Sequence, residues 1–126
     1  MMTTITSVRT VGVPVADQDR ALGFFADTLG FEVRLDAPIS ETERWIEVVP
    51  AQSATSIALI ATGDGGNGVD TGVRFSVPDA QSAHDSMTAR GVQVDELLRW
   101  EGMPPMYTFA DPDGNRFYVV EDQADD

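Results

Sequence analysis

The stretch Val11-Gly12-Val13-Pro14-Val15-Ala16-Asp17 has a counterpart in Val73-Arg74-Phe75-Ser76-Val77-Pro78-Asp79, at a fixed offset of 62 residues (79 − 17 = 62). In both stretches apolar residues alternate with other residues, which predicts a half-buried strand. The aspartate that follows is a typical helix N-cap, because its carboxylate accepts hydrogen bonds from free backbone N–H groups. The offset is about half of the 126 residues. The chain is therefore predicted to contain two copies of one supersecondary module.

Each copy is predicted to run strand, helix, strand, strand, strand. The elements expected in the first copy are a strand over 5–15, a helix from Asp17 to Gly30, and strands over 31–35, 45–49 and 56–61. Those of the second are a strand over 73–77, a helix over 79–91, and strands at 92–94, 106–110 and 117–120. The glycine-rich residues 63–68 are expected to connect the copies. This order predicts an α+β fold with mostly antiparallel pairing.

The composition excludes several classes of protein. Eight arginines and no lysine stand against 21 acidic residues, for a net charge of −13, so nucleic acid and anionic membrane surfaces are disfavoured partners. A cationic small molecule would be attracted, although solubility alone is a simpler reason for such a charge. The chain has no cysteine, which excludes disulfides and thiolate ligands and fits a cytoplasmic protein. No apolar run approaches the length that spans a bilayer.

Two motifs resemble a known superfamily. The residues that carry the resemblance are Val13 to Asp17 with Arg20-Ala21, Phe24-Phe25 and Leu29-Gly30-Phe31, and the closing turn Ala110-Asp111-Pro112-Asp113-Gly114-Asn115. They are similar to the opening and the final hairpin of the vicinal oxygen chelate superfamily, which includes glyoxalases, bleomycin-resistance proteins and extradiol dioxygenases. The resemblance implies a single domain over 1–126, with tandem βαβββ modules over about 4–62 and 70–122. These would form a curled mixed sheet around a cleft, usually in a homodimer.

The resemblance also implies where metal-dependent members carry their ligands. The matching positions are Thr10, Gly72, Tyr118 and the neighbourhood of Ala58 and Leu59. None of these residues offers a carboxylate or an imidazole, which a hard divalent cation prefers. The prediction is that the chain holds no metal and needs no cofactor.

Two other groups of titratable residues are expected to be structural. The single histidine, His84, lies in the second predicted helix without convergent partners, and we expect a structural or surface role. Asp111 and Asp113 lie in the predicted turn, and we expect them to accept bonds from local backbone rather than form an acid–base pair.

Strand alternation predicts which side chains line the cleft. Thr10, Arg74 and Tyr118 are expected on the cleft face, where Arg74 needs an internal partner such as Glu47 or else a carboxylate or phosphate of a ligand. Aromatic and methionine side chains suggest an adaptable apolar surface, with core or dimer interface as the alternative. The predicted ligand-binding residues are Thr10, Trp45, Glu47, Arg74, Trp100, Met103, Tyr107 and Tyr118, with Met106 beside them.

Besides an interaction or regulatory module with an unfilled cleft, three functions are compatible with these residues. The favoured one is a metal-free small-molecule-binding protein of the glyoxalase and bleomycin-resistance type, which sequesters an organic ligand such as an antibiotic. The first alternative is a metal-dependent lyase, isomerase or dioxygenase with non-standard ligands such as Glu47 or Glu101. The second is a metal-free enzyme in which Arg74 or Tyr118 stabilises charge. No catalytic residue is assigned, and the loops over 38–44 and 99–105, which shape the pocket, are not predicted.

Overall fold

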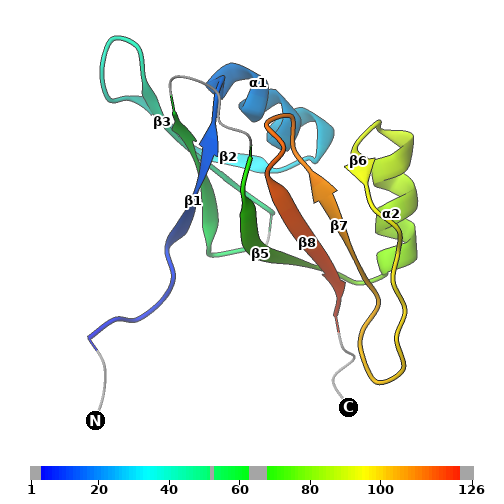
Figure 1. Ribbon diagram of the computed structural model, residues 1–126. Helices are drawn as coiled ribbons and strands as arrows, with labels where there is room; N and C mark the ends of the chain where they lie inside the picture. The colour runs from blue at the N-terminus through cyan, green and yellow to red at the C-terminus, as the bar shows by residue number, and fades with distance from the viewer. Residues whose placement is uncertain (1–3, 52, 63–67, 123–126) are drawn as a thin grey trace. The chain divides into compact units, whose positions relative to one another are not determined.

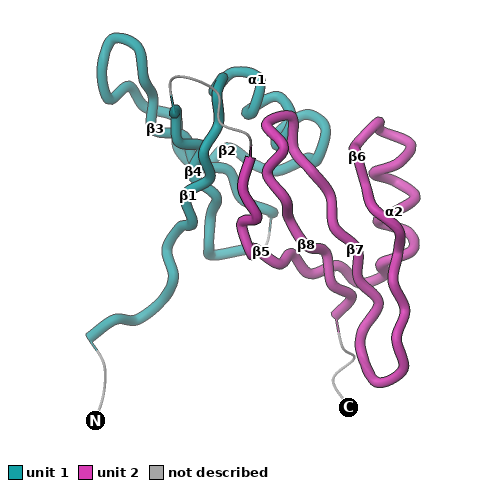
Figure 2. Tube along the Cα trace, in the orientation of Figure 1, with its two compact units in different colours: residues 1–65 teal, residues 66–126 magenta. Residues whose placement is uncertain are grey.

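A computed structural model describes residues 4–51, 53–62 and 68–122. The chain divides into two compact units, residues 1–65 and residues 66–126 (Figure 2). The boundary falls in the glycine-rich segment that the sequence predicts as a connection; of that segment only Gly68 is among the described residues. No described helix has the length and apolar character needed to cross a membrane.

Unit 1 contains one four-stranded sheet and one helical segment (Figure 1). Its elements are β1 (Thr10–Val15), α1 (Gln18–Leu22), the π-helix η1 (Gly23–Thr28), β2 (Glu32–Pro38), β3 (Arg44–Val49) and β4 (Ser56–Ala61). The strand order is β1-β4-β3-β2, with β1 parallel to β4 and the other pairs antiparallel. Val13, Phe25, Ile46 and Leu59 are fully buried and form its core.

The first strand is shorter than predicted. It begins at Thr10 rather than at Ile5, because β4, its neighbour in the described sheet, begins at Ser56 opposite Thr10. Residues 4–9 therefore have no strand to extend the ladder.

The first helix begins as predicted and then changes type. The Asp17 carboxylate accepts a hydrogen bond from the backbone N–H of Arg20 at 3.0 Å, which confirms the N-cap. After Leu22 the α-helix gives way to a six-residue π-helix, which the apolar spacing did not predict. The ring of Phe25 is fully buried there, with the ring of Phe24 edge-on at 5.2 Å.

Unit 2 repeats the architecture of unit 1. Its elements are β5 (Asp70–Val77), α2 (Ala80–Ala89), β6 (Gln93–Val94), β7 (Met106–Ala110) and β8 (Arg116–Glu121). The strand order is β5-β8-β7-β6, again with the first strand parallel to the last and the other pairs antiparallel. The same order in both sheets confirms the α+β fold of tandem modules that the internal repeat predicts.

The core of unit 2 is built on three stacked aromatic rings. Phe75 lies 6.3 Å from Phe109 and 5.7 Å from Phe117, and the last two are 5.3 Å apart. Phe75 thus faces inward from β5, so the alternate residues of that strand, including Arg74, project from the other face. This alternation agrees with the sequence prediction.

The closing hairpin is held by Asp111. Its Oδ1 accepts backbone N–H bonds from Asp113 at 2.9 Å and from Asn115 at 2.8 Å. The side-chain amide of Asn115 donates to Oδ2 of the same carboxylate at 2.9 Å. Asp111 therefore accepts local bonds as expected, and burial raises its pKa.

Candidate ligand-binding site

A polar patch lies on one face of the unit 1 sheet, opposite the face that carries the core residues. Thr10 and Ser56 are register partners in β1 and β4, and the Ser56 hydroxyl lies 2.7 Å from the Thr10 hydroxyl. Glu47 of β3 pairs with Ala58, two residues beyond Ser56, and so projects from the same face. Trp45, two residues before Glu47, shares that face.

The Glu47 carboxylate is the centre of this patch. Oε1 accepts from Arg34 Nη2 at 2.8 Å and Nε at 3.0 Å, and Oε2 accepts from the indole N–H of Trp45 at 2.7 Å. The side chain is only 2% exposed. The Trp45 bond, with the bonds from Arg34 and Ser56, lowers the pKa of Glu47 to about 2 in spite of burial, which opposes the shift. Glu47 is thus a fixed anion whose oxygens face donors.

Arg34 is the functional neighbour that the sequence analysis missed. The sequence predicted Glu47 as a possible partner of Arg74, whereas Glu47 pairs with Arg34 of β2. Arg34 also donates to the backbone carbonyls of Ala54 at 2.8 Å and Arg9 at 3.3 Å. A signal was present, because Arg34 lies between two apolar residues of a predicted strand, the same pattern that singled out Arg74.

A second polar patch lies on the sheet of unit 2. Arg74 of β5 and Tyr118 of β8 are register partners, and the guanidinium carbon lies 4.3 Å from the centre of the tyrosine ring. The Tyr118 hydroxyl donates to Asp70 Oδ2 at 2.8 Å. This bond raises the pKa of Tyr118 and lowers the pKa of Asp70. Tyr118 is therefore a neutral donor near pH 7. Asp70 was not singled out from the sequence.

Gly72 shapes the backbone beneath this second patch. The register of β5 against β8 shifts between Asp70 and Arg74, and Gly72 lies in the left-handed region with φ of 71°. The Gly72 carbonyl accepts a bond from Arg74 Nη1 at 2.8 Å, and its N–H donates to Asp70 Oδ1 at 3.1 Å. The backbone of Gly72 thus holds the side chains of both Arg74 and Asp70 by hydrogen bonds.

The predicted apolar cluster of unit 2 divides into surface and core. Trp100 and Met103 are 50% and 59% exposed in the segment between β6 and β7. Tyr107 is fully buried, its hydroxyl lies 3.2 Å from Met87 Sδ, and burial raises its pKa to about 12. Successive residues of β7 face opposite sides, and Tyr107 faces α2; its place among the binding residues stays a prediction.

His84 contributes to the same helix contact. Its ring meets Tyr107 edge-on at 4.9 Å, and its Nε2 lies 2.8 Å from the Asp95 carbonyl. These are the structural contacts expected of it. Glu101, considered as a non-standard metal ligand, is exposed in a turn of the segment between β6 and β7.

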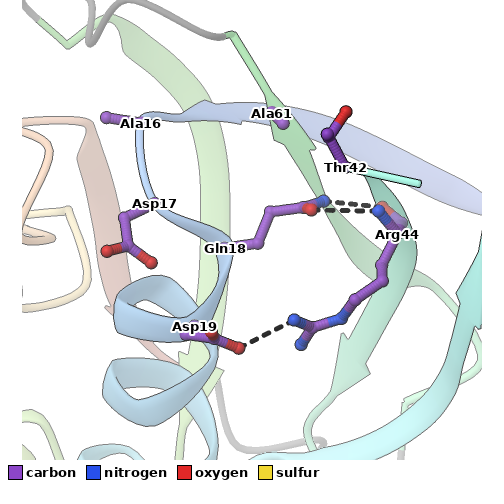
Figure 3. A pocket seen from close by; sticks show the side chains of 7 residues that line it. All are labelled: Ala16, Asp17, Gln18, Asp19, Thr42, Arg44 and Ala61. Atoms are coloured by element: carbon purple, nitrogen blue, oxygen red, sulfur yellow. Dashed lines mark hydrogen bonds and ion pairs between the residues drawn. The ribbon is translucent and has the colours of Figure 1, made fainter. Parts of the chain in front are cut away.

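A pocket of about 300 Å³ opens in unit 1 beside the start of α1 (Figure 3). Gln18 crosses it, exchanging bonds with the backbone of Arg44 at 2.6 and 3.1 Å, and the Arg44 guanidinium pairs with Asp19 at 2.7 Å. The lining residues are Ala16, Asp17, Gln18, Asp19, Thr42, Arg44 and Ala61. None of them is a predicted ligand-binding residue, and the side chains of Gln18, Asp19 and Arg44 are engaged in the bonds just described.

Comparison with protein families now identifies the fold. The family model described as "Glyoxalase/Bleomycin resistance protein/Dioxygenase superfamily" matches residues 7–119. The chain belongs to this superfamily.

The proteins similar to this chain include one with a described ligand class. The crystal structure of TnmS3, an antibiotic binding protein from Streptomyces sp. CB03234, is 29% identical with a TM-score of 0.84, over 97% of this chain and 100% of TnmS3. A superfamily member from Sphaerobacter thermophilus DSM 20745 is 32% identical with a TM-score of 0.86, over 95% and 100% of the two chains. YetH, an uncharacterized protein of Bacillus subtilis (strain 168), is 27% identical over 122 residues, which cover 93% of this chain and 99% of YetH.

The residues at the positions implied for superfamily metal ligands do not form a donor set for a divalent cation. Ala58 and Leu59 are buried and apolar, Thr10 bonds to Ser56, and Tyr118 bonds to Asp70. Within residues 4–51, 53–62 and 68–122, no group of three or more His, Cys, Asp or Glu side chains converges as a metal site would require. The Glu47 carboxylate is paired with the Arg34 guanidinium, so a metal ion bound to Glu47 would have to displace Arg34.

Proposed function

We propose that this chain is a metal-free small-molecule-binding protein that holds, and thereby sequesters, an organic ligand such as an antibiotic. The observation that carries the proposal is the state of Glu47. Its carboxylate is ionised, nearly inaccessible and bonded to Arg34, Trp45 and Ser56, so it is poorly suited to act as a base or as a metal ligand. A protein that only sequesters its ligand needs neither a catalytic base nor a metal ligand.

The chemistry of the sheet faces supports a flat organic ligand. Trp45 in unit 1 and Tyr118 in unit 2 are each fixed by a hydrogen bond to a carboxylate, so their rings are held in place. Fixed rings bind planar molecules with little loss of side-chain entropy. Trp100 and Met103 add exposed apolar surface, and methionine adapts to varied shapes.

The likeness to TnmS3 supports an antibiotic as the ligand class. At 29% identity over nearly the whole of both chains, the comparison extends beyond the bare fold. We propose that this chain shares the general role, and that binding of an antibiotic would confer resistance by lowering its free concentration. The structure of the ligand is not inferred from the relative.

A homodimer is part of the proposal. β2 is an edge strand of the unit 1 sheet, and it exposes Val33 and Leu35 by 47% and 39%. An edge strand with exposed apolar residues offers unpaired backbone groups to a partner. A second copy of the chain would cover this edge, and light scattering on the purified protein would measure a doubled mass.

Fluorescence titration with chemical analysis tests the proposed binding function. Bleomycin and a panel of aromatic antibiotics are titrated against the wild-type protein while tryptophan emission is recorded. Trp45→Phe and Trp100→Phe separate the two emitters, and the ligand is then recovered and its mass measured. Saturable quenching with recovery of unchanged ligand is expected. A ligand returned with an altered mass would point to an enzyme, and absence of quenching by the whole panel would contradict the proposal.

A further inference from the structure

The Arg74 guanidinium is held without a carboxylate partner among the residues that the structure describes. Arg34, Arg44 and Arg116 each form an ion pair with a carboxylate. The recorded contacts of Arg74 are the Gly72 carbonyl and the face of the Tyr118 ring. Arg74 thus lies on a sheet face with a backbone carbonyl and an aromatic ring as its partners, in a chain of net charge −13.

The Asp70 carboxylate interacts electrostatically with Arg74, but both of its oxygens already accept hydrogen bonds from other groups. Its Oδ2 accepts from the Tyr118 hydroxyl at 2.8 Å, and its Oδ1 accepts from the Gly72 N–H at 3.1 Å. Asp70 therefore orients the ring on which Arg74 stacks instead of neutralising the guanidinium by direct contact.

The free donors of Arg74 form a fork. The bond to the Gly72 carbonyl uses Nη1, which leaves Nε and Nη2 without a hydrogen bond to any described residue. These two donors lie on one edge of the planar guanidinium and match the two oxygens of a carboxylate. The guanidinium carbon lies over the Tyr118 ring, 4.3 Å from its centre, so the ring and the Gly72 carbonyl together hold the fork.

We propose that Arg74, stacked on Tyr118, is a subsite for a carboxylate conjugated to an aromatic ring of the ligand. This inference rests on the proposed function and names the chemistry of one end of the ligand. A carboxylate bound in the plane of the fork places its conjugated ring close to that plane. A single negative charge suits the site better than a phosphate monoester, which the net charge of the chain repels more strongly.

Two probes of the same shape, one anionic and one neutral, test whether the site prefers a charged ligand. Naphthalene-2-carboxylate and naphthalene-2-carboxamide are titrated by calorimetry into the wild-type protein and into Arg74→Gln, Arg74→Lys and Arg90→Gln. Arg90 lies at the C-terminal end of α2. Its substitution removes the same charge from the same unit without altering the proposed subsite. Circular dichroism melting checks that each variant is folded.

The wild-type protein should bind the carboxylate about tenfold more tightly than the amide, the lower end expected for a charged hydrogen-bonded pair at an exposed site. Arg74→Gln should remove the preference. Arg74→Lys should keep only a part of it, because lysine lacks the planar fork. Arg90→Gln should retain it in full.

Other results overturn the subsite. Equal affinities of the wild-type protein for carboxylate and amide would do so, as would an undiminished preference in Arg74→Gln. Failure of the wild-type protein to bind either probe at millimolar concentration would also reject it. If the antibiotic panel still quenches tryptophan emission in that case, the proposed function stands without the subsite; if the panel fails too, both are wrong.

Discussion

Replacing Glu47 by glutamine should cost unit 1 much of its stability. Glutamine keeps the shape of the side chain, but its NH₂ group is a donor and would face the N–H donors of Arg34 or Trp45 without an acceptor. The partly buried Arg34 guanidinium would also lose the negative charge that it pairs with. Breaking a buried ion pair on one side typically costs about 3–5 kcal/mol. Because the Arg34 side chain is 29% exposed and solvent screens part of the charge, we expect about 2–3 kcal/mol.

The pH dependence supplies an independent magnitude. Lowering the pKa of Glu47 from 4.5 to about 2 corresponds to at most about 3 kcal/mol of stability. A carboxylate with a depressed pKa stabilises the folded state above the unfolded pKa of 4.5, and this contribution disappears as the pH falls toward 2. The stability difference between the wild-type protein and Glu47→Gln should therefore be constant from pH 7 to about 5 and shrink progressively below that.

Urea unfolding followed by tryptophan emission measures this difference. A Trp100→Phe background leaves Trp45 as the single emitter, so the signal reports on unit 1. Asp19→Asn is the matched control, because the Asp19 carboxylate pairs with Arg44 but is 81% exposed, and its loss should cost under about 1 kcal/mol. A Glu47→Gln cost no larger than that of Asp19→Asn at pH 7, or a difference that stays constant down to pH 3, would refute the reasoning.

Three further substitutions test the fold and the site. Gly68→Ala should destabilise the protein in urea by more than about 2 kcal/mol, since its Cβ would lie 2.4 Å from the backbone of Gly114, whereas Gly30→Ala, with a similar positive φ and open space, should cost about 1 kcal/mol. Tyr107→Phe should leave affinity for any antibiotic found by quenching unchanged; a tenfold loss would place this residue in the binding site. Asp111→Ala should cost about 2 kcal/mol in thermal or urea unfolding, because it leaves backbone N–H groups of the closing turn without an acceptor, and an unchanged midpoint would contradict its role.

The fold was predictable because the repeat carries local and long-range signals together. The aspartate N-caps and the alternating strands recur at one offset, so each copy supports the reading of the other. The length of β1 and the π-helix after Leu22 were not predictable in this way. The first depends on where the partner strand begins, and for the second the apolar spacing along the chain carries no signal.

The sequence predicted which sheet face the site residues lie on, but not which side chains pair with one another. Alternation placed Arg74 and Tyr118 on one face of the sheet, and the structure makes them register partners in contact. The pairing of Glu47 with Arg34 depends on the order of strands in the sheet and on a register shift between Val33 and Leu35. The burial of Tyr107 against α2 was not predictable from its neighbours in the sequence, because adjacent strand residues point to opposite faces.

The most direct test of the central claim is affinity measured with and without metal. A ligand identified by quenching is titrated into protein treated exhaustively with EDTA, and then into the same protein supplied with nickel, zinc, manganese or iron. We predict the same dissociation constant in every titration. Binding that appears only after one metal is added, or that tightens by tenfold or more with it, would contradict the account.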